Sequence, residues 1–85
     1  MTTENTHKVY ANLTEEESIF ACNLGDELQV LRESQDISRR ELAKRANVDH
    51  STLILIEQGK RLPTLRILLK LSKALHRDLS VMFND

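Results

Sequence analysis

Apolar side chains recur along this chain at spacings of three and four residues, the period of one face of an α-helix. The first such series is Phe20, Leu24, Leu28 and Leu31. Thr14 and Glu17 stand at the spacing of a capping box, so this helix is expected to begin at Thr14, after a polar, unpatterned arm over residues 1–13. Gly25 lies inside the series and indicates either the close approach of another helix or a break.

Four more helices are predicted, each with its own start or stop signal. Ser38 opens a second capping box, Thr64 and Asp78 stand as N-caps, and Gly59 is a helix-stop glycine. The apolar faces of these helices are Leu42, Ala43 and Ala46, then Leu53 and Ile56, then Leu65, Leu68, Leu71 and Leu75, then Leu79, Val81, Met82 and Phe83. The pattern therefore predicts one all-α domain over residues 14–85.

Three of the predicted helices end at residues that tolerate the left-handed conformation. These residues are Asp36, Asn47 and His76. Asp, Asn and His are the non-glycine residues most often found there, and a left-handed residue commonly closes a helix. We therefore expect a structural role for His76 rather than a role as metal ligand or general base.

The composition fits a small helical domain. The chain has 85 residues, 4% aromatic side chains and no Trp, so its core must be built from aliphatic side chains. The single cysteine, Cys22, cannot form an internal disulfide and is expected to be a buried, inert thiol. No apolar run reaches the ~20 residues of a membrane span, and the polar N-terminus lacks a signal-peptide core, which favours a cytoplasmic protein.

No sequence feature predicts an enzyme. The chain shows no Cys/His set at metal-ligand spacing, no glycine-rich phosphate loop and no nucleophile beside a base, so neither a metal nor a cofactor is expected.

Charge is distributed unevenly along the chain. Residues 1–37 carry two basic and eight acidic side chains, whereas residues 38–85 carry ten basic and five acidic ones. A basic half suits a polyanionic partner, although a mixed, solvated surface would give the same count.

An ordered set of short motifs carries a resemblance over about 60 residues. They are Leu24-Gly25, Leu28, Arg32, Ser38-Arg39-Arg40-Glu41-Leu42-Ala43, Val48, Ser51-Thr52-Leu53, Ile56-Glu57-Gln58-Gly59-Lys60-Arg61-Leu62-Pro63, Leu68, Leu71 and Ala74-Leu75. In this order and spacing they resemble the Cro/repressor (lambda-repressor-like, XRE) helix-turn-helix family. The resemblance implies a compact five-helix fold with its helix-turn-helix unit at 38–58. It also implies a DNA-binding transcriptional regulator, expected to be a repressor that reads a palindromic operator in double-stranded DNA.

The resemblance assigns roles to individual residues. It implies DNA contacts for Arg39 at the start of the first helix of the unit, and for His50, Ser51 and Thr52, which begin the recognition helix at 50–57. It implies phosphate contacts for Lys60, Arg61 and Arg66. Arg32 and Glu57 are implied to form an ion pair that fixes the recognition helix. Lys44 and Arg45 fit either a phosphate clamp or a solvated helix face.

Ile54 and Leu55 depart from the family pattern, because polar or basic residues usually stand at these outward positions. Three interpretations remain open. The two side chains contact thymine methyl groups in DNA, or they form a patch for a protein partner in an anti-repressor or co-regulator, or the helix is shifted so that they are buried in the fold or in a dimer.

Homodimerisation is expected because one helix-turn-helix covers only a few base pairs. Val81, Met82 and Phe83 are the first candidates for the interface. The segment Val9–Leu13 with Ile19 and Phe20 is the second. Alternatively, both sets cover the core of the monomer.

Overall fold

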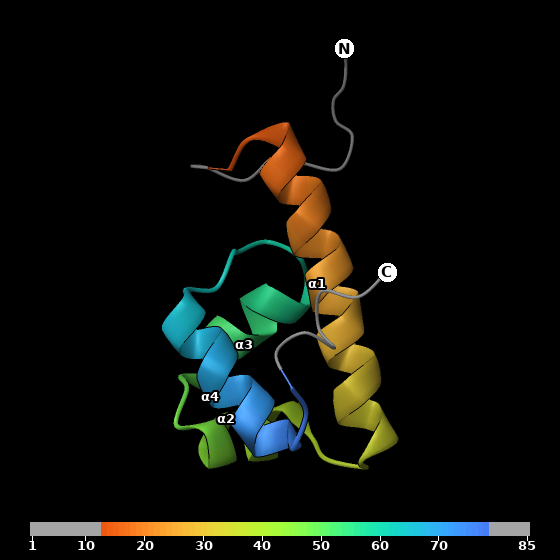
Figure 1. Ribbon diagram of the computed structural model, residues 1–85, viewed down its shortest axis with the longest axis vertical. Coiled ribbons are helices and arrows are strands. Elements are labelled where there is room, and N and C mark those ends of the chain that lie inside the picture. Colours follow the sequence, from red (N-terminus) through yellow and green to blue (C-terminus); the bar gives the residue numbers. More distant parts are fainter. Residues whose placement is uncertain (1–12, 79–85) are drawn as a thin grey trace.

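The fold is all-helical, as predicted. The computed structural model describes residues 13–78, which form four helices and no strand. The helices are α1 (Glu15–Ser34), α2 (Arg39–Ala46), α3 (His50–Glu57) and α4 (Leu65–Leu75) (Figure 1). The described part thus holds four helices rather than five. The fifth, expected to follow Asp78, falls on residues 79–85, which lie outside the described residues.

Local signals define the helix ends. The Thr14 hydroxyl accepts from the Glu17 N–H at 3.0 Å and the Glu17 carboxylate accepts from the Thr14 N–H at 3.0 Å, which is the predicted capping box. The second capping box is only half formed. Ser38 accepts from the Glu41 N–H at 3.0 Å, but the Glu41 side chain turns to Arg45 instead, 2.8 Å away. The competing partner four residues along the helix explains this difference.

The three residues predicted to take the left-handed conformation do so. Their φ angles are 58° at Asp36, 56° at Asn47 and 56° at His76. Asn47 and His76 are the C-caps of α2 and α4. These residues bring the chain out of each helix within one residue, which keeps the connections between the helices short.

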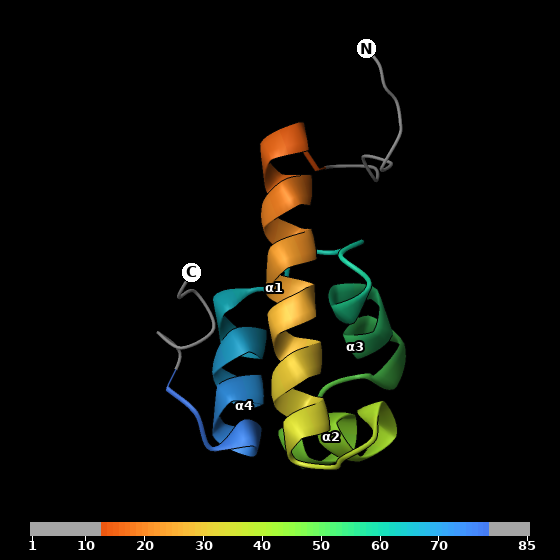
Figure 2. The ribbon, with the colours of Figure 1, turned by 90° about the vertical axis from the view of Figure 1, so that its right-hand side faces the viewer.

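Helix α1 is the longest element, and the others pack along part of it. It contacts α3, while α2 contacts both α3 and α4. Its first turns extend past the other three helices (Figure 1). Figure 2 shows α3 on one side of α1 and α4 on the other, with α2 at the far end.

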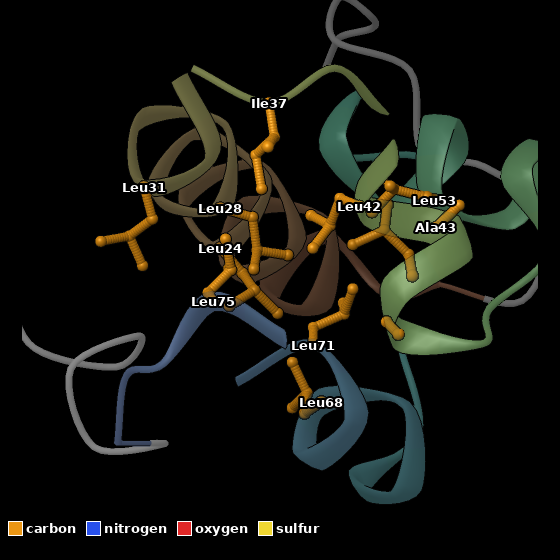
Figure 3. Packing of buried hydrophobic residues seen from close by; sticks show 12 residues of the cluster. Leu24, Leu28, Leu31, Ile37, Leu42, Ala43, Leu53, Leu68, Leu71 and Leu75 are labelled. Carbon is orange, nitrogen blue, oxygen red and sulfur yellow. The ribbon is translucent and has the colours of Figure 1, made fainter. Parts of the chain in front are cut away.

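The core lies between the four helices (Figure 3). Its buried side chains are Leu24, Leu28, Leu31, Ile37, Leu42, Ala43, Ala46, Leu53, Ile56, Leu68, Leu71 and Leu75. Two predicted members are instead exposed, Phe20 by 45% and Leu65 by 62%. Ala21 is buried in place of Phe20. At this turn of α1 the side chain that points toward the core is that of residue 21 and not that of residue 20. Leu65 stands in the first turn of α4, where its neighbours on both sides are also exposed.

Gly25 marks a close approach and not a break. Helix α1 is continuous through it. A Cβ atom at this position would lie 2.5 Å from the Ile56 carbonyl oxygen and 2.7 Å from that of Glu57. The end of α3 therefore packs directly on the backbone of α1, and only glycine leaves room for it.

The prediction of a buried thiol was wrong, because Cys22 is exposed. It lies on the side of α1 that faces Gly59, where an added Cβ would be 2.8 Å from the Cys22 sulfur. Gly59 has a φ of 75° and turns the chain away after α3. Since the chain leaves α1 there, one side of Cys22 stays open to solvent.

Candidate nucleic-acid interface

Helices α2 and α3 are joined by a turn of only three residues, 47–49. Val48 donates its N–H to the Ala43 carbonyl at 2.9 Å, which closes the end of α2. Asp49 then takes the N-cap position of α3. So short a turn holds the two helices in one relative orientation, with the start of α3 at the surface. This is the arrangement in which a second helix can enter the major groove of DNA.

Helix α3 has an inner face and an outer face. Leu53 and Ile56 are fully buried. Of the first three residues of the helix, Ser51 is exposed, while His50 and Thr52 are partly buried. The three residues that the resemblance assigns to base contact thus stand at the accessible start of the helix.

Ile54 and Leu55 were expected to point outward, but both are partly buried. They fall between the inner residues Leu53 and Ile56 in sequence, so each lies roughly 100° around the helix from one of them. The part that remains accessible lies on the same side of α3 as Ser51.

The polar atoms at the start of α3 already have partners within the protein. The Ser51 hydroxyl donates a hydrogen bond to the Asp49 carboxylate. This hydrogen bond is the main reason why the pKa of Asp49 lies below its ordinary value of 3.8. The backbone N–H of Thr52 lowers the pKa further. The Arg61 guanidinium donates to the Thr52 hydroxyl oxygen at 3.4 Å. Arg61, in the loop after α3, is thereby tied to the start of the recognition helix.

Arg32, Arg39 and Glu57 form one charged cluster between α1, α2 and α3. The Glu57 side chain is 0% exposed and accepts from Arg32 Nε at 2.8 Å and Arg32 Nη2 at 3.1 Å. Arg32 Nη1 also donates to the Ile37 carbonyl at 2.8 Å, so its guanidinium is well satisfied. The Arg39 Nε lies 3.8 Å from Glu57 Oε1, the oxygen that also accepts from Arg32 Nη2. The sequence did not indicate this last contact, because the turn between α1 and α2 sets it.

The remaining basic residues differ in their surroundings. Lys60 is partly buried, and Arg61 and Arg66 are exposed. Arg45 forms an ion pair with Glu41 at 2.8 Å, one helical turn away, and its side chain is 48% exposed. Lys44 is exposed.

The surfaces expected for dimerisation are only partly described. Val81, Met82 and Phe83 lie outside the described residues. Ile19 and Phe20 of the second candidate surface are exposed. The sequence did not predict that Leu65 and Leu69 on α4 are exposed apolar side chains.

Among residues 13–78 no helix is long and apolar enough to cross a membrane, and no cluster of His, Cys, Asp and Glu could hold a metal ion.

Two solved structures share this arrangement of helices. One is the restriction-modification controller protein C.AhdI from Aeromonas hydrophila, with a TM-score of 0.75 and 29% sequence identity over 76% of this chain and 98% of that one. The other is an HTH_3 family transcriptional regulator from Vibrio cholerae, with a TM-score of 0.75 and 28% identity over 79% of this chain and 38% of that one. No curated protein sequence matches the chain.

The short turn between α2 and α3, the accessible start of α3 and these structural neighbours define a helix-turn-helix DNA-binding protein. The sequence profile of the helix-turn-helix family HTH_3 matches residues 28–82. The chain belongs to this family, which confirms the resemblance seen in the sequence, and it is a DNA-binding transcription regulator.

Proposed function

We propose that the chain represses transcription by binding a palindromic operator as a homodimer, with α3 of each protomer in the major groove. The observation that carries this proposal is the orientation of α3, whose first residues are accessible while Leu53 and Ile56 anchor it in the core. An α-helix with its side chains is about 10–12 Å across, so α3 fits the roughly 12 Å wide major groove.

The cations around α3 would hold the DNA backbone. Arg39 lies at the start of α2, where backbone N–H groups and a positively polarised helix end also favour a phosphate. Its side chain is 41% exposed and so remains available to DNA. Lys60, Arg61 and Arg66 follow α3 and would contact phosphates, whereas His50, Ser51 and Thr52 would face base edges.

The small size of the reading element supports binding as a dimer. Two half-sites roughly 34–36 Å apart let two copies of α3 contact more base pairs than a single copy can. A dimer that occupies such a site within a promoter excludes RNA polymerase by its bulk. The similarity to a controller protein supports a regulatory role.

A binding selection tests the proposal. The protein is titrated against a randomised duplex library at several salt concentrations, and the retained duplexes are sequenced. We expect a steep fall of affinity with salt and one enriched inverted repeat. Retention of no duplex at low salt would refute the proposal.

The second candidate function is a protein-interaction module that uses Ile54 and Leu55. Its support is the apolar surface that α3 leaves accessible at these positions. Leu55→Lys separates the two candidates. The variant should change the selected DNA sequence if α3 reads DNA, and it should abolish capture of a protein partner if α3 binds one.

A further inference from the structure

Guanine is poorly matched by the outer face of α3. In the major groove guanine presents two acceptors, N7 and O6, and so requires donors. The Ser51 hydroxyl already donates its only hydrogen to Asp49. Ile54 and Leu55 carry no donor. No side chain in the middle of this face can therefore supply what guanine needs.

The side chains on this face are mainly aliphatic. Ser51 and Leu55 are four residues apart, so they lie one above the other on the side of α3 opposite the buried core residues. Ile54 lies beside them, three residues from Ser51. Both aliphatic side chains are partly buried, and each retains accessible surface.

We propose that Ser51, Ile54 and Leu55 form a reader of C5-methyl groups in the major groove. This surface selects thymine over pyrimidines that lack the methyl group, and it accepts 5-methylcytosine at the same position. The inference rests on the proposed function, since it requires α3 to lie in the groove. DNA is the occupant that the charges favour, because Arg39 and Arg61 lie near opposite ends of α3 and attract phosphate.

The chemistry of the major groove supports this assignment. Thymine is the only unmodified base that presents a methyl group there, and an aliphatic side chain gains by burying it. Burial of one methyl group is worth about a fourfold change in affinity. Two symmetry-related contacts in a dimer give about 15-fold. A C5-methyl group on cytosine projects from the same ring position, so the same side chains would bury it.

The test uses the duplex that binds most tightly in a selection from a randomised library. Each thymine is replaced singly by deoxyuridine, which removes only the methyl group. At one position in each half-site we expect affinity to fall about fourfold, and about 15-fold when both are replaced. That T·A pair is then changed to C·G and to 5-methylcytosine·G. The methylated pair should bind about fourfold more tightly than the unmethylated one.

Two variants show whether α3 is the reader. Leu55→Gln removes the aliphatic surface and should bring the thymine-to-deoxyuridine ratio close to one. Val30→Gln, on an exposed position of α1, is the matched control and should leave the ratio unchanged. Circular dichroism and urea unfolding establish that both variants are folded.

The possible outcomes separate this inference from the proposed function. Salt-dependent binding with equal affinity for thymine and deoxyuridine duplexes would overturn methyl reading and leave the DNA-binding regulator in place. A ratio that Leu55→Gln does not change would also overturn the assignment to α3. Failure to retain any duplex at low salt would overturn both, and would favour a protein partner for this surface.

Discussion

Glu57 is a fully buried carboxylate shared by two arginines from two other elements. Removing it strands the Arg32 guanidinium, which is itself buried. We expect Glu57→Ala to lower the free energy of unfolding by about 3–5 kcal/mol, because the buried charge of Arg32 loses its only buried counter-charge and keeps only the exposed Glu33 carboxylate, 3.9 Å away. Urea unfolding followed by circular dichroism measures this loss.

Arg61→Ala is the control for this prediction, since Arg61 is exposed and makes a single long hydrogen bond to Thr52. Its stability should stay within about 0.5 kcal/mol of the parent protein. Its affinity for DNA should nevertheless fall, because a phosphate contact is lost. A larger loss of stability for Arg61→Ala than for Glu57→Ala would contradict the roles assigned to the two residues.

Asp49 should make stability depend on pH in acid. Its pKa is lowered by the hydrogen bond from Ser51, so the carboxylate stabilises the fold above its unfolded-state pKa. That contribution is lost as the pH falls through the lower folded-state value. Below about pH 4 the parent protein should therefore lose stability more steeply than Asp49→Asn does.

Urea midpoints measured from neutral pH down to about pH 3 test this expectation. Ser51→Ala is the companion variant, because it removes the donor and keeps the carboxylate. It should reduce the same part of the pH dependence. Equal acid sensitivity in all three proteins would show that the Ser51–Asp49 bond contributes nothing to folding.

At the scale of the elements, the contact between α1 and α3 depends on Gly25. Alanine would gain about 1 kcal/mol in helix propensity at this position. Its Cβ would however lie 2.5 Å and 2.7 Å from two backbone carbonyl oxygens that cannot turn aside. We therefore expect Gly25→Ala to destabilise the protein by about 2 kcal/mol or more, against its local propensity.

Asn23→Ala is the matched control for Gly25→Ala, because Asn23 is exposed on the same helix. It should raise the free energy of unfolding by about 0.5 kcal/mol. Thermal and urea unfolding of the two variants compare the effects directly. A stabilised Gly25→Ala protein would mean that α1 and α3 are further apart than the structure places them.

The helix signals that were predictable are local ones. The capping box at Thr14 and the left-handed residues Asp36, Asn47 and His76 depend on neighbours within a few positions, so the sequence alone specifies them. Contacts between elements are different. The Arg39–Glu57 approach and the exposure of Cys22 follow from how α1, α2 and α3 lie against each other. Periodicity fixes which side of a helix is apolar but not where along its length the neighbours end, and Leu65 was misplaced for that reason.

Across the whole molecule, positive charge is concentrated in the half of the chain that contains α2, α3 and α4. Ten of the twelve basic residues follow residue 37, while eight of the thirteen acidic ones precede it. The near-neutral net charge of −1 therefore does not argue against DNA binding. What matters for affinity is the number of cations that displace counterions from phosphates, and this number can be measured.

Arg66 gives the most direct measurement, because it is exposed in the first turn of α4, after the loop that carries Lys60 and Arg61. Each lost phosphate contact lowers the slope of log K against log salt by about 0.9, so Arg66→Ala should reduce it by about 2 in a dimer. Lys73→Ala removes the same charge from the last turn of α4, and its slope should match that of the parent. Fluorescence anisotropy with one labelled duplex at 50–200 mM salt, roughly the range over which such contacts weaken most visibly, gives both slopes. Equal reductions for the two variants would indicate a diffuse charge effect, and would remove Arg66 from the interface.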